Sequence, residues 1–317
     1  MTDPRGSLFT AHWGTFRVRL REGRPDIRPW EGDPDPPEIG AGMAEMVDHP
    51  LRIRRPAVRR TFLEKGHRAG GEGRGREPFV ALPWDEALDL AAAELERVRR
   101  EHGNGAIFGG SYGWASAGRF HHAQSQIHRF LNAIGGYVAH TDNYSYAAVN
   151  NLAPHVVGRF KSLLLDHATS WPVIAEHTKL MVMFGGLPVK NAQINSGGLG
   201  RHVLREALLA ARANGCEFVN ISPLASDVIG EVRAEWLAIR PNTDTALMLA
   251  LAHTLLVEGL HDRDFLARYT VGFERFEPYL TGAADGQPKD ADWAAAITGI
   301  EAGTIRGWRA AWRPRAP

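Results

Sequence analysis

Short apolar runs recur along most of this sequence, and each is followed by a small-residue loop and then by a helical pattern. Four such runs lie at residues 106–110, 180–186, 217–222 and 235–240. Strands that alternate with helices in this way predict a parallel, doubly wound sheet, and we expect all four in one sheet. The expected fold class is therefore α/β, with ligands bound beyond the carboxyl ends of the strands.

The chain divides into three expected regions. Residues 1–78 read as a small β-rich domain, because the stretch HWGTFRVRLREGRPDIRPW alternates like a hairpin. Residues 79–155 begin the α/β region, where PWDEALDLAAAELERVRREHG has helical spacing with acidic residues near its start and Gly103 at its end. Residues 156–317 form a second α/β domain.

Composition limits the function classes. Of the 317 residues, 44% are hydrophobic, and the formal net charge is only +1 with scattered basic residues, which argues against a nucleic-acid partner. The lone Cys216 excludes a disulfide framework, a zinc ribbon and a cysteine-ligated iron–sulfur cluster, and it reads as a small buried hydrophobe. We find no signal-peptide core and no apolar run long enough to cross a bilayer, so we expect a cytoplasmic protein with no membrane partner.

The loops after the apolar runs carry the candidate ligand groups. Their glycine pairs, such as Gly185 and Gly186, form neither a G-x-G-x-x-G fingerprint nor a Walker loop, so each alone indicates only a tight turn. Together, the four loops are equally consistent with four simple turns and with the binding of a ligand that contains a nucleotide. The second interpretation is possible because backbone amides in such loops can bind phosphate. In the last loop, Thr243 or Asp244 can cap the following helix while the other faces a ligand.

Other polar and aromatic residues have simpler interpretations. The spacing of His121, His122 and His128 fits no familiar zinc arrangement, so surface or packing roles are expected. The segment TDNYSYAAVNN, which contains Ser145, lacks a nucleophile elbow and reads as the start of a helix. Tyr112 and Trp114 read as core aromatics, although their glycine-rich loop offers little to pack against.

Long segments nevertheless resemble the molybdenum enzymes of the dimethyl sulfoxide reductase family, in particular the branch of biotin sulfoxide, trimethylamine N-oxide and dimethyl sulfoxide reductases. The likeness extends from LFTAHWGTF to about Arg306. Its main segments are SYGWASAGRFHHAQSQIHRFLNAIGG, DNYSYAAVNNLAPHVVG, TSWPVIAEHTKLMVMFGG, NISPLASD and the stretch from IRPNTDTAL to YLTG.

The resemblance implies molybdenum held by bis(molybdopterin guanine dinucleotide), without an iron–sulfur cluster, and a protein oxygen ligand matching Ser145. It also implies that Tyr112 and Trp114 face the metal and donate hydrogen bonds to the oxygen being removed from substrate. The implied activity is oxygen-atom transfer from S-oxides or N-oxides, of the biotin sulfoxide or methionine sulfoxide type, with an electron-donor protein or reduced nicotinamide. The implied cofactor-binding residues are Ser111, Gly113, Trp114, Ser145, Gly185, Gly186, Pro188, Lys190, Ser222, Pro223, Asp227, Asn242 and Asp244.

The chain is shorter than the family pattern. After ITGIEAGTIRGW it ends in RAAWRPRAP, where family members continue into further α/β and C-terminal regions. We therefore expect a fold truncated relative to the family. The alternative to an active reductase is a catalytically inactive truncated fragment of such an enzyme.

Overall fold

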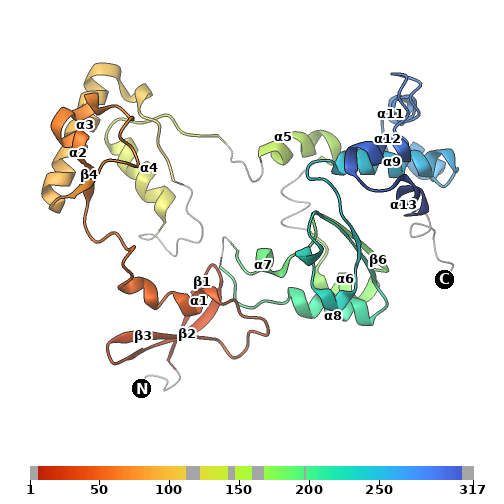
Figure 1. Cartoon of the computed structure of the whole chain (residues 1–317), viewed down its shortest axis with the longest axis horizontal. Coiled ribbons are helices and arrows are strands. Elements are labelled where there is room, and N and C mark those ends of the chain that lie inside the picture. Colours follow the sequence, from red (N-terminus) through yellow and green to blue (C-terminus); the bar gives the residue numbers. More distant parts are fainter. Residues whose placement is uncertain (1–5, 112–121, 142–146, 159–167, 196–197, 309–317) are drawn as a thin grey trace. The chain divides into compact units, whose positions relative to one another are not determined.

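The structure of the chain is a computed structural model (Figure 1). It covers residues 6–111, 122–141, 147–158, 168–195 and 198–308. A mixed α/β architecture is present, with antiparallel sheets near the N-terminus and a parallel sheet later in the chain, so the expected fold class is confirmed.

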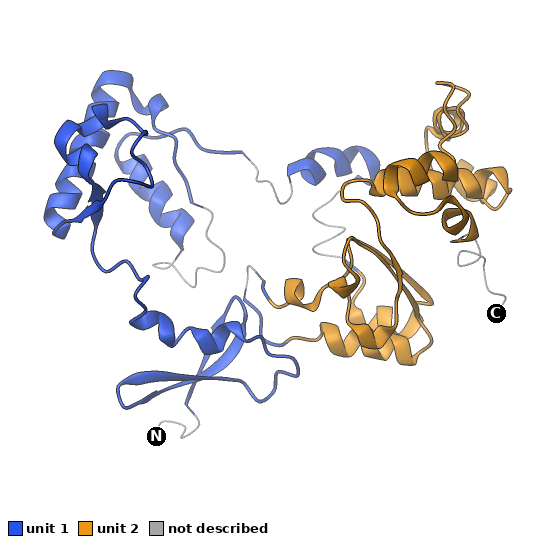
Figure 2. Cartoon of the chain, viewed as in Figure 1, with its two compact units in different colours: residues 1–168, 194–201 blue, residues 169–193, 202–317 orange. Residues whose placement is uncertain are grey.

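The chain forms two compact units (Figure 2). Unit 1 comprises residues 1–168 and 194–201, and unit 2 comprises residues 169–193 and 202–317. The domain boundaries expected at residues 78 and 155 remain predictions.

Unit 1 begins with an antiparallel sheet of three strands in the order β1 (Ser7–Ala11), β2 (Gly14–Arg21) and β3 (Arg24–Pro29). The expected hairpin is confirmed, because β2 and β3 pair through a two-residue turn. Both turn residues, Glu22 and Gly23, have positive φ angles of 52° and 78°, as a turn matching the twist of the strands requires.

The remaining elements of unit 1 are mostly helical. A two-stranded sheet pairs β4 (Ala57–Arg59) with β5 (Phe79–Ala81). The expected helix over residues 83–103 is confirmed as α3 (Trp84–His102), which ends at Gly103 with φ of 75°. The other helices are α1 (Ile39–Gly42), α2 (Arg60–Lys65), α4 (Ala123–Ala133) and α5 (Ala147–Val156).

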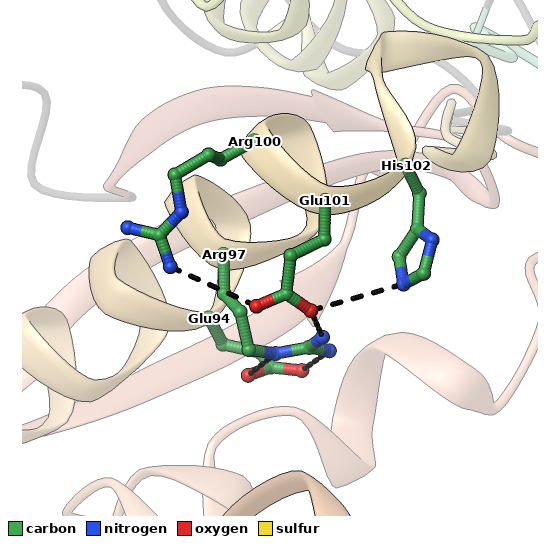
Figure 3. Close-up of polar contacts among 5 residues, drawn as sticks. All are labelled: Glu94, Arg97, Arg100, Glu101 and His102. Atoms are coloured by element: carbon green, nitrogen blue, oxygen red, sulfur yellow. Dashed lines mark hydrogen bonds and ion pairs between the residues drawn. The ribbon is translucent and has the colours of Figure 1, made fainter.

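Charged side chains form a network on the C-terminal half of α3 (Figure 3). Arg97 contacts Glu94 at 2.6 Å and Glu101 at 2.7 Å, at the i,i+3 and i,i+4 spacings that bring side chains together on a helix. Arg100 and His102 lie 3.7 and 3.9 Å from the Glu101 carboxylate. Hydrogen bonding from Arg97 holds the pKa values of Glu94 and Glu101 below their usual range.

One expected strand pairs differently from the prediction. Phe108, in the apolar run 106–110, forms an isolated parallel bridge with Val138 in unit 1, supported by a 2.8 Å bond from the Val138 amide to the Ile107 carbonyl. The sheet of unit 2 contains only the other three predicted strands among the described residues. The expectation of four strands in one sheet was therefore wrong.

Unit 2 is built on a parallel sheet in the order β6 (Leu180–Phe184), β7 (Glu217–Ile221) and β8 (Glu235–Leu237). Parallel strands need helical crossovers, and α8 (Leu204–Ala213) supplies the connection between β6 and β7. The other helices are α6 (Trp171–His177), α7 (Val189–Ala192), α9 (Asp244–Val257), α10 (Arg263–Tyr269), α11 (Phe273–Leu280), α12 (Ala291–Thr298) and α13 (Ala302–Gly307).

Each face of this sheet packs against its own hydrophobic cluster. Val219 and Ile221 of β7 join residues of α9, α12 and α13, whereas Phe218 points to the other face and joins α6 and α8. Successive side chains of a strand alternate between faces, so β7 is apolar on both. Burying an aliphatic side chain such as Ile221 or Leu208, both with no exposed surface, stabilises the fold by about 1.5–3 kcal/mol.

Candidate nucleotide-binding edge of the parallel sheet

Three of the predicted loops follow the carboxyl ends of neighbouring parallel strands. The loop that starts at Gly185 follows β6, the loop that starts at Ser222 follows β7, and residues 238–243 connect β8 to α9. Since the strands are parallel, these loops begin at the same edge of the sheet, where α/β proteins bind ligands. The fourth predicted loop, after residue 110, belongs to unit 1.

The loop after β6 turns sharply at its two glycines. Gly185 and Gly186 have φ of 86° and 72°, a region that residues with a side chain rarely adopt. Their amides and that of Leu187 donate to protein carbonyls, at 2.8 Å to Ile221, 3.4 Å to Met183 and 2.6 Å to Asp227. The amides of this loop are therefore engaged within the protein rather than free for a phosphate.

Two further predicted residues follow in the same loop. Pro188 is the residue immediately before α7, and its fixed φ of −70° suits the entry into a helix. Lys190 lies in α7 and is exposed, and no ion pair of its ammonium group occurs among the described residues. A free lysine at this edge can neutralise an anionic group.

A hydrogen bond between two side chains connects the start of the loop after β7 to its later part. Ser222 is fully buried, and its hydroxyl donates to Asp227 Oδ2 at 2.5 Å while accepting from the Leu224 amide at 3.3 Å. Pro223 is exposed at the turn. Asp227 is half-buried, and its carboxylate is held in place by the hydrogen bond from Ser222.

The loop after β8 leads into the longest helix of unit 2. Asn242 is exposed with φ of 64°, in the left-handed region that asparagine tolerates. The Thr243 hydroxyl donates backwards to the Arg240 carbonyl at 2.7 Å and does not cap α9. Asp244 begins the helix, where a carboxylate is favoured by the helix dipole, but the expectation that one of these two side chains caps α9 was wrong.

Asn220 is a site residue that the sequence predictions missed. It has no exposed surface and lies in β7 directly beneath the loop, with its Nδ2 donating to the carbonyls of Leu224 at 3.1 Å and Ala225 at 3.3 Å. The signal available in the sequence was one amide side chain inside the apolar run EFVNIS. A buried polar group in a strand requires hydrogen-bond partners, and here the loop provides them.

The metal-site and cofactor-binding residues predicted in unit 1 lie at the end of one described stretch or outside the described residues. Ser111 is half-buried and ends a described stretch. Tyr112, Gly113, Trp114 and Ser145 lie outside the described residues.

The remaining histidines of interest have ordinary structural contacts. The His122 side chain accepts a hydrogen bond from the Ser125 amide at the start of α4, at 3.1 Å. His128 stacks on Tyr137 with 5.6 Å between ring centroids, and His121 is outside the described residues. No cluster of three potential metal ligands occurs among the residues that the structure describes.

Cys216 is fully buried before β7, as expected. Burial raises the pKa of its thiol, which disfavours the reactive thiolate. This cysteine is therefore a packing residue.

Two adjoining cavities of about 440 and 320 Å³ lie elsewhere in unit 2, around α10 and α11. Both are lined by His261, Leu266, Thr270 and Phe273, and none of the predicted site residues lines either one. The candidate site is thus an edge formed by loops and is separate from these two cavities.

Comparison with known proteins decides the family. Residues 52–310 match the family model described as molybdopterin oxidoreductase, and residues 10–48 match its N-terminal domain. The chain belongs to the molybdopterin oxidoreductase family. The family resemblance predicted from the sequence is confirmed, and membership implies molybdenum held by a molybdopterin.

Relatives in the sequence comparison include the dimethyl sulfoxide/trimethylamine N-oxide reductase of Rhodobacter capsulatus, 42% identical over 93% of this chain and 36% of that protein. The biotin sulfoxide reductase of Cereibacter sphaeroides is 44% identical over 88% of this chain and 38% of that protein. The trimethylamine-N-oxide reductase of Haemophilus influenzae is 38% identical over 94% and 36%. The chain therefore spans little more than a third of the length of these molybdopterin oxidoreductases.

A solved structure is also similar. Acetylene hydratase from Pelobacter acetylenicus aligns with a TM-score of 0.58 at 21% identity, covering 95% of this chain and 38% of that one. At this identity the likeness shows the fold alone. In the described part of this molybdopterin oxidoreductase chain, no helix combines the length and apolar character that a membrane crossing requires.

Proposed function

We propose that this chain is the part of a molybdenum-dependent oxygen-atom-transfer reductase that binds a guanine nucleotide arm of bis(molybdopterin guanine dinucleotide). The observation that carries the proposal is its identity of 42–44% to reductases of dimethyl sulfoxide, trimethylamine N-oxide and biotin sulfoxide over nearly the whole chain. The substrate proposed for the whole enzyme is a small S-oxide or N-oxide. An inactive fragment is the competing interpretation.

The described residues of unit 2 fit the nucleotide end of this cofactor. A carboxylate accepts the hydrogen bonds of guanine N1–H and N2–H, and Asp227 and Asp244 both lie at the proposed edge. The exposed Lys190 complements the negative charge of a pyrophosphate. The two carboxylates can therefore pair with the guanine base and the lysine with its phosphates, whereas the amides of the loop after β6 are engaged within the protein.

The roles proposed in unit 1 rest on the family resemblance. Ser145 supplies the protein ligand to molybdenum, and a hard alkoxide oxygen suits a high-valent metal. Tyr112 and Trp114 orient the substrate by donating from the phenol O–H and the indole N–H to the S=O or N=O oxygen. When bound, the cofactor supplies two-electron oxygen-atom chemistry that amino-acid side chains lack.

The reductase assignment is tested by assaying the purified chain with dimethyl sulfoxide, biotin sulfoxide and trimethylamine N-oxide, using a reduced viologen as the electron source. The chain should be produced in a host that makes the guanine dinucleotide cofactor. Turnover that disappears in Ser145→Ala, with an unchanged circular dichroism spectrum, is the expected result. Cofactor-loaded protein without turnover of any of the three would favour the inactive fragment, and full activity of the variant would overturn the ligand assignment.

Several finer predictions accompany this proposal. The electron donor is a redox protein or reduced nicotinamide, no iron–sulfur cluster takes part, and neither nucleic acid nor a membrane is a partner. The proposed location is the cytoplasm, which cell fractionation tests directly.

A further inference from the structure

A backbone hydrogen bond connects the loop after β6 to the loop after β7, and Asn220 lies in β7 beneath this contact between the loops. The Leu187 amide of the first loop donates to the Asp227 carbonyl of the second at 2.6 Å. The carboxylate of the same Asp227 accepts from Ser222, so this residue is fixed through both its backbone and its side chain. Any group that holds the second loop in place therefore also holds the first.

Asn220 holds the second loop from below. Its strand partners are Met183 in β6 and Trp236 in β8, and it is the buried polar residue of that row. Its Nδ2 donates to two loop carbonyls, those of Leu224 and Ala225. Only the amide nitrogen can face two carbonyls, so these contacts also fix which way the side chain is turned.

The other end of the same side chain faces the first loop. Asn220 Oδ1 is buried and has no hydrogen-bond partner among the described residues. A Cβ added to Gly186 would lie 3.1 Å from this oxygen and 2.6 Å from the Asp227 carbonyl oxygen. A glycine hydrogen fits at this point and a methyl group does not, so the two loops meet at Gly186.

We infer that Asn220 is a positioning residue that joins the two loops and thereby sets the Asp227 carboxylate for the nucleotide. This inference rests on the proposed function and names a residue that acts on the nucleotide only through Asp227 and Ser222. Because the loop contacts form within the protein, the carboxylate is already in place before a ligand arrives. Preorganisation of this kind increases affinity by lowering the ordering cost of binding.

The test compares Asn220→Ala with Val219→Ala in the full chain. Val219 is the neighbouring residue of β7, 3% exposed, and its side chain lies in the hydrophobic cluster on the opposite face, away from both loops. The dissociation constant of GDP is measured by calorimetry, and hydrogen exchange of the Leu187 amide reports the junction between the loops. Thermal unfolding shows that both variants fold and gives the stability lost by each.

We expect Asn220→Ala to weaken GDP binding about tenfold or more, a difference of about 1.4 kcal/mol, and to accelerate exchange at Leu187. Val219→Ala should leave both within about twofold at a comparable loss of Tm. Unchanged GDP affinity in Asn220→Ala, or an equal loss in Val219→Ala, overturns the inference.

The failure of the proposed function has a different signature. If the unsubstituted chain does not bind GDP, its nucleotide role is contradicted. Leu187 exchange then decides the loop coupling alone: acceleration restricted to Asn220→Ala supports it, and equal exchange in both variants overturns it. Should Asn220→Ala fail to fold, Asn220→Asp preserves the side-chain volume while removing the two donated hydrogens, and the same comparison applies.

Discussion

At the scale of single residues, the two glycines after β6 both have positive φ angles, of 86° and 72°, but different surroundings. A Cβ on Gly185 would meet open space, whereas a Cβ on Gly186 would lie 2.5 Å from Asp227 Cβ and 2.6 Å from its backbone oxygen. Gly185→Ala should therefore cost only the strain of a positive φ, about 1 kcal/mol. Gly186→Ala adds a clash with backbone and should cost about 2–4 kcal/mol.

Chemical denaturation of the two variants measures this contrast. Equal losses would show that the backbone conformation alone requires glycine. A Gly186→Ala protein as stable as Gly185→Ala would thus contradict the close approach of the two loops.

A second prediction at this scale concerns Tyr112, which the family resemblance places against substrate. Tyr112→Phe removes one hydrogen-bond donor, and loss of a donor to reacting oxygen reduces kcat/KM by about tenfold or more. We expect a larger loss for sulfoxides than for trimethylamine N-oxide. Tyr137→Phe makes the same chemical change at a residue stacked on His128 and is the control. An unchanged ratio of the two kcat/KM values in Tyr112→Phe would contradict the proposed role.

The sequence indicated the candidate site residues at the edge of the sheet, but it did not indicate their hydrogen-bond partners. Residue types such as Gly185, Ser222 and Asp227 are visible in the loops, and the topology of parallel strands brings their loops to one edge. The engagement of the Leu187 amide by Asp227 was not predictable, because it is a pairing between residues 40 positions apart in the chain (227 − 187). Asn220 was missed for a different reason: its partners are only four and five positions away, but the backbone conformation that turns their carbonyls towards the strand is not visible in the sequence.

At the scale of elements, two helices of unit 2 begin with different side-chain chemistry. Asp290 caps α12 by accepting from the Trp293 amide at 2.8 Å, whereas Thr243 donates away from α9. Asp290→Ala should lower the free energy of unfolding by about 1 kcal/mol, the usual value of an N-cap. Thr243→Ala should change it by less than about 0.5 kcal/mol. Urea denaturation distinguishes them, and a larger loss for Thr243→Ala would contradict the assignment of the caps.

The ion pairs of unit 1 give a pH prediction. Hydrogen bonding from Thr61, followed by the charge of Arg59, holds the pKa of Glu77 below its usual range. Glu77 lies 2.6 Å from Arg59 and joins β4 to the start of α2, with only 9% of its side chain exposed. Its contribution to stability is therefore present above the unfolded-state pKa of about 4.3 and is lost as the pH falls through the lower folded-state value.

Glu77→Gln should accordingly lower Tm at pH 7, with a difference from wild type that shrinks towards pH 3. Glu101→Gln is the control, because Glu101 belongs to the exposed network of α3 (Figure 3), where ion pairs contribute little. A Glu77→Gln effect that persists unchanged at pH 3, or a larger effect in Glu101→Gln, would contradict this account.

Elements with strong local patterns were predictable and sheet membership was not. The helix α3 and the hairpin of β2 and β3 follow from spacing, acidic residues near a helix start, and turn residues. The apolar run 106–110 satisfies the same strand pattern as β6, yet it pairs with Val138 in unit 1. Periodicity describes which faces of a segment are apolar, but it does not specify which distant strand will be its neighbour.

At the scale of the whole molecule, the family matches cover both groups of residues to which we assign roles. The family matches extend from residue 10 to residue 310 and so include the segments around Tyr112 and Ser145 as well as the loops of unit 2. The chain spans only 36–38% of the relatives' length. The reductase activity of the whole protein therefore remains a proposal, whereas nucleotide binding is a proposal about residues that this chain contains.

The most direct test of the central claim is the amount of molybdenum and guanine bound per chain after purification from a host that makes the cofactor. Elemental mass spectrometry gives the metal, and acid hydrolysis followed by chromatography gives GMP. Bis(molybdopterin guanine dinucleotide) predicts a guanine-to-molybdenum ratio of about two, independent of how fully the protein is loaded. A folded chain that contains neither metal nor guanine, or one that holds molybdenum without guanine, would contradict the account.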